Sequence, residues 1–95
     1  MAIEVTEEAA EVLLRSLDLG GVDRASGGIR LRGARSLGGG FDVQVELAAG
    51  PEDGDDVIEA FGVRVFVGAD VRDALPNAVV DLELQHDIVV VRPVA

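Results

Sequence analysis

The chain contains no cysteine, lysine, tryptophan or tyrosine among its 95 residues. Without cysteine there can be no disulfide, no thiolate nucleophile and no sulfur-ligated metal site made by this chain alone. Without lysine there can be no Schiff base and no P-loop lysine. Because aromatic residues are only 3% of the chain, we expect a core of valine, leucine, isoleucine and alanine, completed by Phe41, Phe61 and Phe66.

Positive charge is also scarce, since the net charge is -10 and the sequence pI is about 4.2. Such a chain repels phosphate backbones and anionic lipids, which argues against nucleic acid and membranes as partners. No apolar run approaches the roughly 20 residues that a helical span requires. The opening MAIEVTEE is acidic and lacks the apolar centre of a signal peptide, so we expect a cytoplasmic protein.

The size and composition predict a single domain over residues 1–95. A chain of 95 residues buries too little surface for two separate cores. Its hydrophobic content of 48% and mean hydropathy of +0.31 are too high for a disordered chain.

Hydrophobic periodicity predicts a strand over residues 2–5 and then a helix over residues 6–17. The apolar residues of the helix recur at the spacing of one helical face: Ala10, Leu13, Leu14 and Leu17. Thr6 is positioned to cap the first turn, and Gly20 and Gly21 follow the last one.

Residues 27–48 alternate between apolar and polar side chains on both sides of a glycine-rich loop, which predicts a hairpin with one wet face. If the loop centres near Gly38, Arg30 lies opposite Glu46 and Arg32 lies opposite Gln44. A slip of one residue would place arginine against valine. Charge and apolar pattern therefore favour the same register.

The second half of the chain predicts four more strands and a short helix. Two strands over 57–67 meet near Gly62, and two strands over 78–93 turn at residues 85–87, with Leu84 on the apolar face of the first. A helix of about two turns follows Gly68 and ends at Pro76. One long helix, one short helix and about seven strands make the fold class α+β.

The loop before Phe41 contains Gly38, Gly39 and Gly40, and successive glycine N–H groups can form a nest for an anion. Phosphate loops, however, deliver the anion to a helix N-terminus, whereas the residues after this loop read as a strand. A plain hairpin loop is therefore the preferred interpretation.

Ser36 and His86 are candidates for nucleophile and base, because ARSLG loosely resembles a nucleophile elbow and His86 is the single imidazole. An elbow requires a strand-to-helix turn on a parallel sheet that this chain is too short to build. We prefer a loop serine and a solvated histidine.

Four carboxylates, Glu52, Asp53, Asp55 and Asp56, gather in one turn and raise the hypothesis of a Ca²⁺ site. Their spacing lacks the alternate ligands and the distant bidentate glutamate of an EF-hand. A solvated acidic turn is the preferred interpretation.

Taken together, these motifs resemble the HesB/IscA-like family, the A-type carriers of iron–sulfur cluster assembly, from about Ile3 to Pro93. The stretches that carry the resemblance are IEVTEEAAEVLLRSL, GGIRLRGARSLGGGFDVQVEL, GVRVFV and IVVVRP. The resemblance implies a HesB-like domain in which the N-terminal helix packs on short antiparallel or mixed sheets, in a β-sandwich-like arrangement.

The family's cluster ligands are cysteines, one in the glycine-containing loop and two in a C-terminal tail. Alignment of Glu46 and Leu47 with the family's return strand places Gly38 at the loop cysteine, and the tail pair has no counterpart up to Ala95. Gly38, Gly39 and Gly40 thus resemble the backbone of a metal loop that has lost its metal. The resemblance supplies no catalytic, cofactor-binding or metal-binding residue.

We therefore expect a non-enzymatic HesB/IscA-like protein, related to iron–sulfur cluster assembly, that has a protein-interaction or accessory role and carries no cofactor. The alternative is a small-ligand or oxygen-ligated metal-binding module, suggested by the loops at 18–28 and 36–40 and by the acidic turn. A homodimer is expected because a chain this small leaves strand edges to cover. A metal site shared by two copies through His86 and carboxylates stays open.

Overall fold

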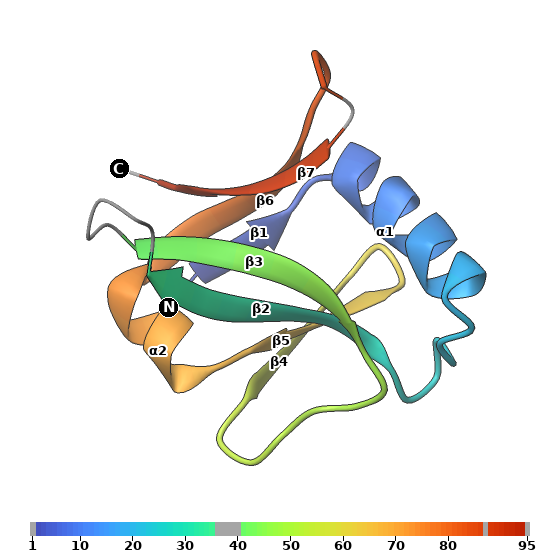
Figure 1. The fold of residues 1–95 in the computed structure, drawn as a ribbon, viewed down its shortest axis with the longest axis horizontal. Helices are drawn as coiled ribbons and strands as arrows, with labels where there is room; N and C mark the ends of the chain where they lie inside the picture. Colours follow the sequence, from blue (N-terminus) through green and yellow to red (C-terminus); the bar gives the residue numbers. More distant parts are fainter. Residues whose placement is uncertain (1, 36–40, 87, 95) are drawn as a thin grey trace.

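The computed structural model of the protein describes residues 2–35, 41–86 and 88–94. These residues fold into two small β-sheets and two helices (Figure 1). Along the chain, the elements are β1 (Ala2–Val5), α1 (Glu7–Leu19), β2 (Gly28–Arg35), β3 (Phe41–Ala48), β4 (Asp56–Ala60), β5 (Val63–Val67), α2 (Ala69–Ala74), β6 (Asn77–Glu83) and β7 (Ile88–Pro93). The described ranges thus hold the predicted seven strands, long helix and short helix, and the α+β class is confirmed.

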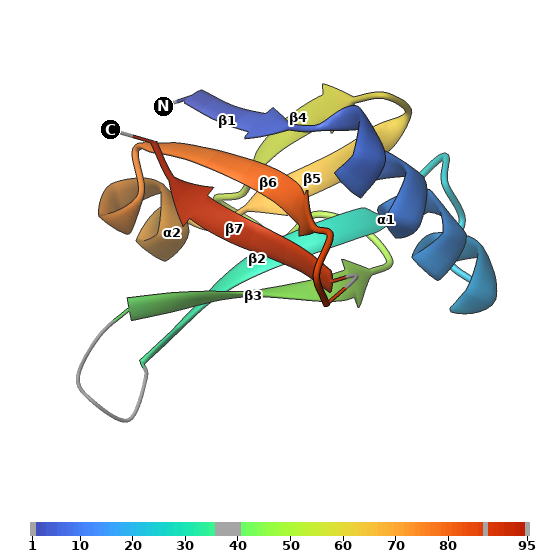
Figure 2. The same ribbon diagram turned by 90° about the horizontal axis from the view of Figure 1, so that it is seen from above.

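The strands form two mixed sheets that face each other (Figures 1 and 2). One has the order β1–β6–β7 and the other has the order β3–β2–β5–β4. The pairs β1–β6 and β2–β5 are parallel, and the remaining pairs are antiparallel. Each sheet is therefore held together by strands that are far apart in the sequence.

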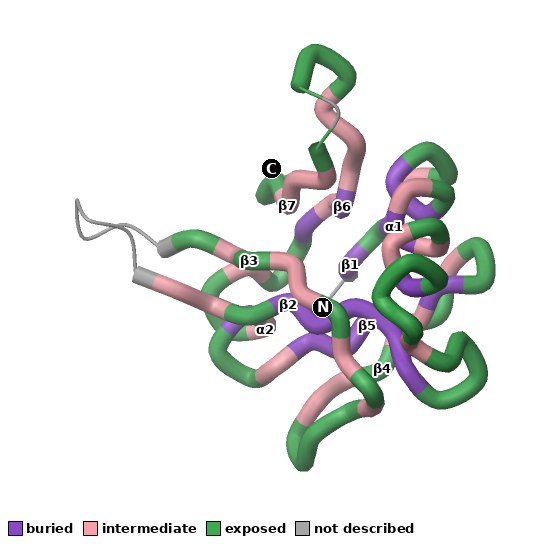
Figure 3. The backbone as a smooth tube through the Cα atoms, turned by 45° about the vertical axis from the view of Figure 1, so that its right-hand side comes forward, coloured by how far each residue is buried: buried purple, intermediate pink, exposed green. Residues whose placement is uncertain are grey.

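The hydrophobic core lies between the two sheets, where both contribute buried aliphatic side chains (Figure 3). Along the central strands every second residue points into this core, as Ile29 and Leu31 do in β2 and Val63, Val65 and Val67 do in β5. The aliphatic core is confirmed, but the expected contribution of Phe61 is wrong, because this side chain is 58% exposed.

Helix α1 contacts β5, β6 and β7, so it closes one end of the space between the sheets. Its buried side chains are Ala9, Ala10, Leu13 and Leu17. Thr6 is the N-cap, as predicted, and its Oγ1 accepts a hydrogen bond from the backbone N–H of Ala9 at 3.2 Å. The short helix α2 buries Val71 and ends just before Pro76.

The β2–β3 hairpin has the predicted register. Arg30 is the Cα partner of Glu46, and Arg32 is the partner of Gln44. The face of the hairpin that was expected to be exposed to solvent is only partly exposed, however, because Arg30 is 6% exposed. Phe66 of β5, its partner across the parallel pair, is fully buried.

Phe66 points away from the main core, because its neighbours Val65 and Val67 point into it. It is buried nevertheless, and the segment of residues 49–55 is fastened to Arg30 on the same face. The outer face of the four-stranded sheet therefore carries a small covered region that the alternating pattern of the sequence did not predict.

Strands β6 and β7 confirm the two strands expected near the C-terminal end, with Val80 opposite Val91. Leu84 lies beyond the end of β6 and is 81% exposed, so its predicted place on the apolar face is wrong. Within the described residues, neither helix has the length and apolar character required to cross a membrane.

Candidate functional site

The glycine loop is presented by the end of a hairpin. Gly38, Gly39 and Gly40, together with Ser36, lie outside the described residues. Arg35 and Phe41 on either side are Cα partners, so a strand enters the loop and a strand leaves it. The described residue that follows the loop, Phe41, begins a strand, whereas a phosphate loop and a nucleophile elbow both lead into a helix.

His86 lies in the turn between β6 and β7, with 62% of its side chain exposed, and its Nδ1 contacts a carboxylate oxygen of Glu83. This turn and the end of the β2–β3 hairpin lie at opposite ends of the sheets (Figures 1 and 2). The solvated interpretation of His86 therefore agrees with its observed exposure.

The acidic turn is tied to the protein by one buried arginine. Nη2 of Arg30 lies 2.8 Å from Oδ2 of Asp55 and 3.1 Å from Oε2 of Glu52, and it donates to the carbonyl oxygen of Gly50 at 3.4 Å. The Asp55 side chain is 4% exposed, whereas that of Glu52 is 64% exposed. The expectation of a solvated turn is thus wrong for Asp55.

Opposing effects set the pKa of Asp55. Burial raises this pKa, but the hydrogen bonds that Asp55 accepts from Arg30 and from the backbone N–H of Glu52, together with the arginine charges, outweigh burial. The net result is a pKa below the ordinary value for aspartate. The carboxylate is therefore held in its ionised form by a fixed cation.

A second network joins the start of α1 to the three-stranded sheet. The Asp81 carboxylate accepts from the backbone N–H of Leu82 at 2.8 Å and from Oγ1 of Thr6 at 3.0 Å, and it also contacts Arg92. The hydrogen bonds from the Leu82 backbone and from Thr6 lower the pKa of Asp81 most, burial opposes them, and the Arg92 charge adds to the lowering. These contacts give Asp81 a structural role.

Among the described residues, no group of three or more histidine, aspartate or glutamate side chains is arranged to hold a metal ion. Asp56, the next carboxylate of the acidic turn, lies 3.0 Å from Nη1 of Arg72. Guanidinium groups thus occupy the positions that a cation would take beside Asp55 and Asp56.

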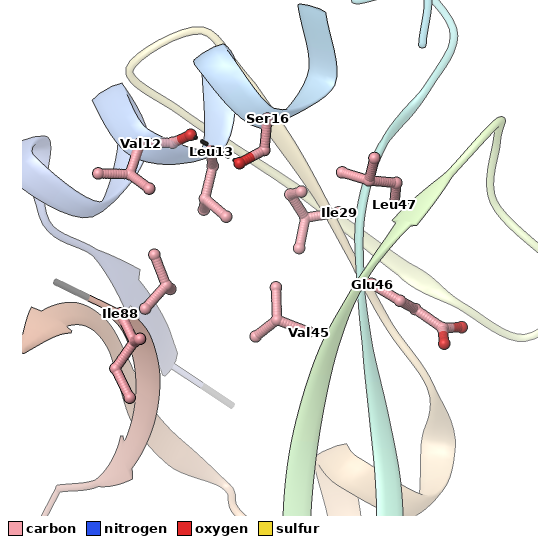
Figure 4. A pocket seen from close by; sticks show the side chains of 9 residues that line it. Val12, Leu13, Ser16, Ile29, Val45, Glu46, Leu47 and Ile88 are labelled. Carbon is pink, nitrogen blue, oxygen red and sulfur yellow. Dashed lines mark hydrogen bonds between the residues drawn. The ribbon is translucent and has the colours of Figure 1, made fainter. Parts of the chain in front are cut away.

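An apolar groove of about 340 Å³ opens between α1, the β2–β3 hairpin and the start of β7 (Figure 4). Its lining residues are Val12, Leu13, Ser16, Ile29, Val45, Glu46, Leu47, Ile88 and Val89. Figure 4 shows aliphatic side chains around the opening, with the Glu46 carboxylate directed away from it. That carboxylate instead binds Nε of Arg32 at 2.8 Å.

A second depression of about 210 Å³ continues along α1 and shares Val12 and Ser16 with the groove. Its other lining residues are Arg15 and Leu19, and Leu19 is 91% exposed. Sequence reasoning missed both hollows, since the groove depends on how α1, the β2–β3 hairpin and β7 are placed, and the second depression adjoins it along α1. One residue in the sequence could have indicated the groove: Val12 is apolar but lies outside the helical face assigned to the core.

Comparison with known proteins gives the fold. No protein family profile matches the chain, and no curated protein sequence matches it. The fold resembles that of IscA with its 2Fe–2S cluster, with a TM-score of 0.76 and 22% identity over 95% of this chain and 81% of that one. Escherichia coli SufA, which is involved in iron–sulfur cluster biosynthesis, has a TM-score of 0.74 and 20% identity, covering 96% of this chain and 77% of that one.

A protein from Aquifex aeolicus, determined by solution NMR, has a TM-score of 0.73 and 20% identity. The match covers 99% of this chain and 93% of that one. The chain therefore has the fold of IscA and SufA over at least 95% of its length, and the predicted arrangement of sheets and helices is confirmed.

Proposed function

We propose that this protein is a cysteine-free member of the HesB/IscA-like family that acts in iron–sulfur cluster assembly by binding protein partners, without carrying a cluster. The observation that carries the proposal is the combination of an IscA-like fold over 95% of the chain with a sequence that has no thiol.

The donor set does not fit an iron–sulfur cluster as cargo. Clusters are held by thiolates, with histidine as an occasional replacement. The chain has no cysteine, and its single histidine contacts Glu83. Asp55, Asp56 and Asp81 are in ion pairs with arginines, so their oxygens are already neutralised by fixed cations.

Anaerobic reconstitution with iron and sulfide tests this proposal, with IscA treated in parallel to show that the procedure works. We expect the desalted protein to be colourless, to lack charge-transfer absorption and to hold far less than one iron per chain. A brown product with stoichiometric iron and sulfide would refute the proposed function.

The groove favours a second candidate, a module that binds a small apolar ligand. A cavity of about 340 Å³ lies at the lower end of the range for small-molecule sites. The oxygen-ligated metal version of this candidate has no support from the described residues. A ligand at a hundred times its Kd adds about 2.7 kcal/mol to stability, so a thermal-shift screen with fatty acids and aromatic metabolites would reveal it.

The protein is further proposed to be cytoplasmic, non-enzymatic and homodimeric through its strand edges, with neither nucleic acid nor membrane as a partner. Four strands lie at sheet edges in the described part of the chain: β1, β3, β4 and β7. Edges of this kind invite pairing with a second copy. Sedimentation velocity across a concentration series tests the dimer, and a single monomeric species at all concentrations would exclude it.

A further inference from the structure

The groove and the second depression beside it form an apolar surface that runs along α1. Leu47 and Ile88 border the groove and are 42% and 50% exposed, and Leu19 at the far end is 91% exposed. Val12 and Ser16 line both hollows, so the two lie side by side along the helix. Two adjoining hollows along a helix suit an extended or helical segment better than a compact molecule.

Negative charge predominates beside this groove. Glu8 precedes Val12 by four residues, so it lies on the same stripe of α1, and Glu11 precedes Arg15 in the same way. Both glutamates are exposed. On the other side, Glu83 is the Cα partner of Ile88. Arg15 is the cation that lines the hollows.

We infer that the groove binds a cationic amphipathic peptide segment of a partner protein, with an apolar stripe in the groove and lysines or arginines beside Glu8, Glu11 and Glu83. This inference rests on the proposed role in protein binding and is independent of the cluster pathway. A second copy of this chain is the weaker candidate for the groove, because a chain of net charge -10 offers few cationic side chains to these glutamates, whereas the dimer proposed above would form through backbone pairing at strand edges. A cationic segment is attracted by the negative charge beside the groove.

Direct titration with a synthetic peptide tests the inference. The probe is a fluorescent peptide of about 14 leucine and lysine residues, with leucine at helical spacing so that one side is apolar. A peptide of the same composition in scrambled order, which has no apolar stripe, is the control for charge alone. We expect binding by the striped peptide to exceed binding by the scrambled one by about tenfold.

Matched variants locate the binding surface. Ile88→Asp changes a residue that borders the groove, and Val57→Asp changes a β4 residue outside it, and both side chains are 50% exposed. Each adds the same negative charge, which would strengthen a purely electrostatic attraction. We expect Ile88→Asp to weaken binding by about tenfold and Val57→Asp to change it by less than about twofold. Leu47→Asp, also at the groove, should behave as Ile88→Asp does.

A second set of variants tests whether the carboxylates beside the groove contribute to peptide binding. Glu8→Gln combined with Glu11→Gln removes two charges beside the groove, whereas Glu4→Gln combined with Glu59→Gln removes two exposed charges from β1 and β4. We expect the first pair to weaken binding by about three- to tenfold and to flatten its salt dependence more than the second pair does. Circular dichroism of every variant establishes that it is folded before titration.

Several outcomes would overturn the inference: no binding of the striped peptide, equal binding of the scrambled one, or equal losses for Ile88→Asp and Val57→Asp. Self-association that Ile88→Asp abolishes would assign the groove to a second copy. Cluster uptake in the reconstitution experiment would refute the proposed function without changing the peptide result. Failure of the peptide would leave the absence of cluster carriage standing.

Discussion

At the scale of single residues, Phe61 has a backbone conformation that its side chain disfavours. It has φ of 51° and is followed by Gly62 with φ of 83°, in the two-residue turn between β4 and β5. Type I′ turns need positive φ at both central positions and favour Asn-Gly. Placing an L-residue with a bulky side chain in the left-handed region lowers the stability of the fold by about 1–2 kcal/mol. The exposed ring of Phe61 recovers little of this cost by burial.

We predict that Phe61→Asn raises the free energy of unfolding by about 1 kcal/mol, because asparagine tolerates the left-handed conformation. Urea unfolding followed by circular dichroism measures the change. Phe61→Ala is the control, since it also removes the exposed ring but keeps the backbone cost. An equal gain from both variants would show that loss of the ring, and not the turn, is responsible.

Asp55 and Glu52 contact the same guanidinium of Arg30 but differ in exposure. Asp55→Asn would leave a nearly buried arginine with one exposed carboxylate partner. We predict a loss of about 3 kcal/mol for Asp55→Asn, because breaking a buried ion pair strands a charge, and a loss under about 1 kcal/mol for Glu52→Gln. Chemical denaturation of both variants makes the comparison, and losses of the same size would contradict it.

At the scale of elements, Thr6 connects α1 to the three-stranded sheet. Its oxygen accepts from the first turn of the helix and its hydroxyl donates to Asp81. We predict that Thr6→Ala lowers the free energy of unfolding by about 1 kcal/mol or somewhat more, since both bonds are lost. Thr6→Ser keeps the hydroxyl and should lose less than half as much. Thermal unfolding of the pair tests this, and equal losses would assign the effect to the threonine methyl group.

The elements that the sequence predicts well are those with local causes. The N-cap of α1 follows from Thr6, and the β2–β3 register follows from alternation on both sides of the loop. The parallel pairs β1–β6 and β2–β5 were not predicted individually, because the pairing of distant strands leaves no periodic signal. The cover over Arg30 and Phe66 was missed for the same reason, since alternation predicts which face a side chain occupies and not what lies above it.

In the candidate site, too, features with local causes were predicted from the sequence and features that depend on tertiary packing were not. The absence of sulfur is readable from composition, and the polar surroundings of His86 are readable from its neighbours in the turn. The groove was not predicted, because Val12, Val45 and Ile88 come from three elements and are brought together only by tertiary packing.

At the scale of the whole molecule, acid stability depends on the two carboxylates whose pKa values are lowered. Asp55 and Asp81 have lower pKa values folded than the ordinary aspartate value of 3.8. Such groups contribute stability that is fully present above their unfolded pKa and is lost as pH falls through the folded pKa. Both therefore stabilise the native state at neutral pH and cease to do so in acid.

We predict that the free energy of unfolding is level above about pH 5 and falls below about pH 4, where the unfolded chain takes up protons that Asp55 and Asp81 resist in the folded one. The slope below pH 4 should be shallower in Asp55→Asn than in the unaltered protein, because one of the two groups is gone. Urea titrations at a series of pH values give both slopes, and identical slopes would exclude a contribution from Asp55.

The pairing of β1 with β6 also governs when the protein can acquire its shape during synthesis. Ala2 to Val5 leave the ribosome well before Asn77 to Val80, the residues with which they pair. Strand β1 must therefore wait, with its apolar side chains uncovered, until β6 has also been synthesised. Formation of this sheet is expected to be late and comparatively slow, as for other topologies rich in distant pairings.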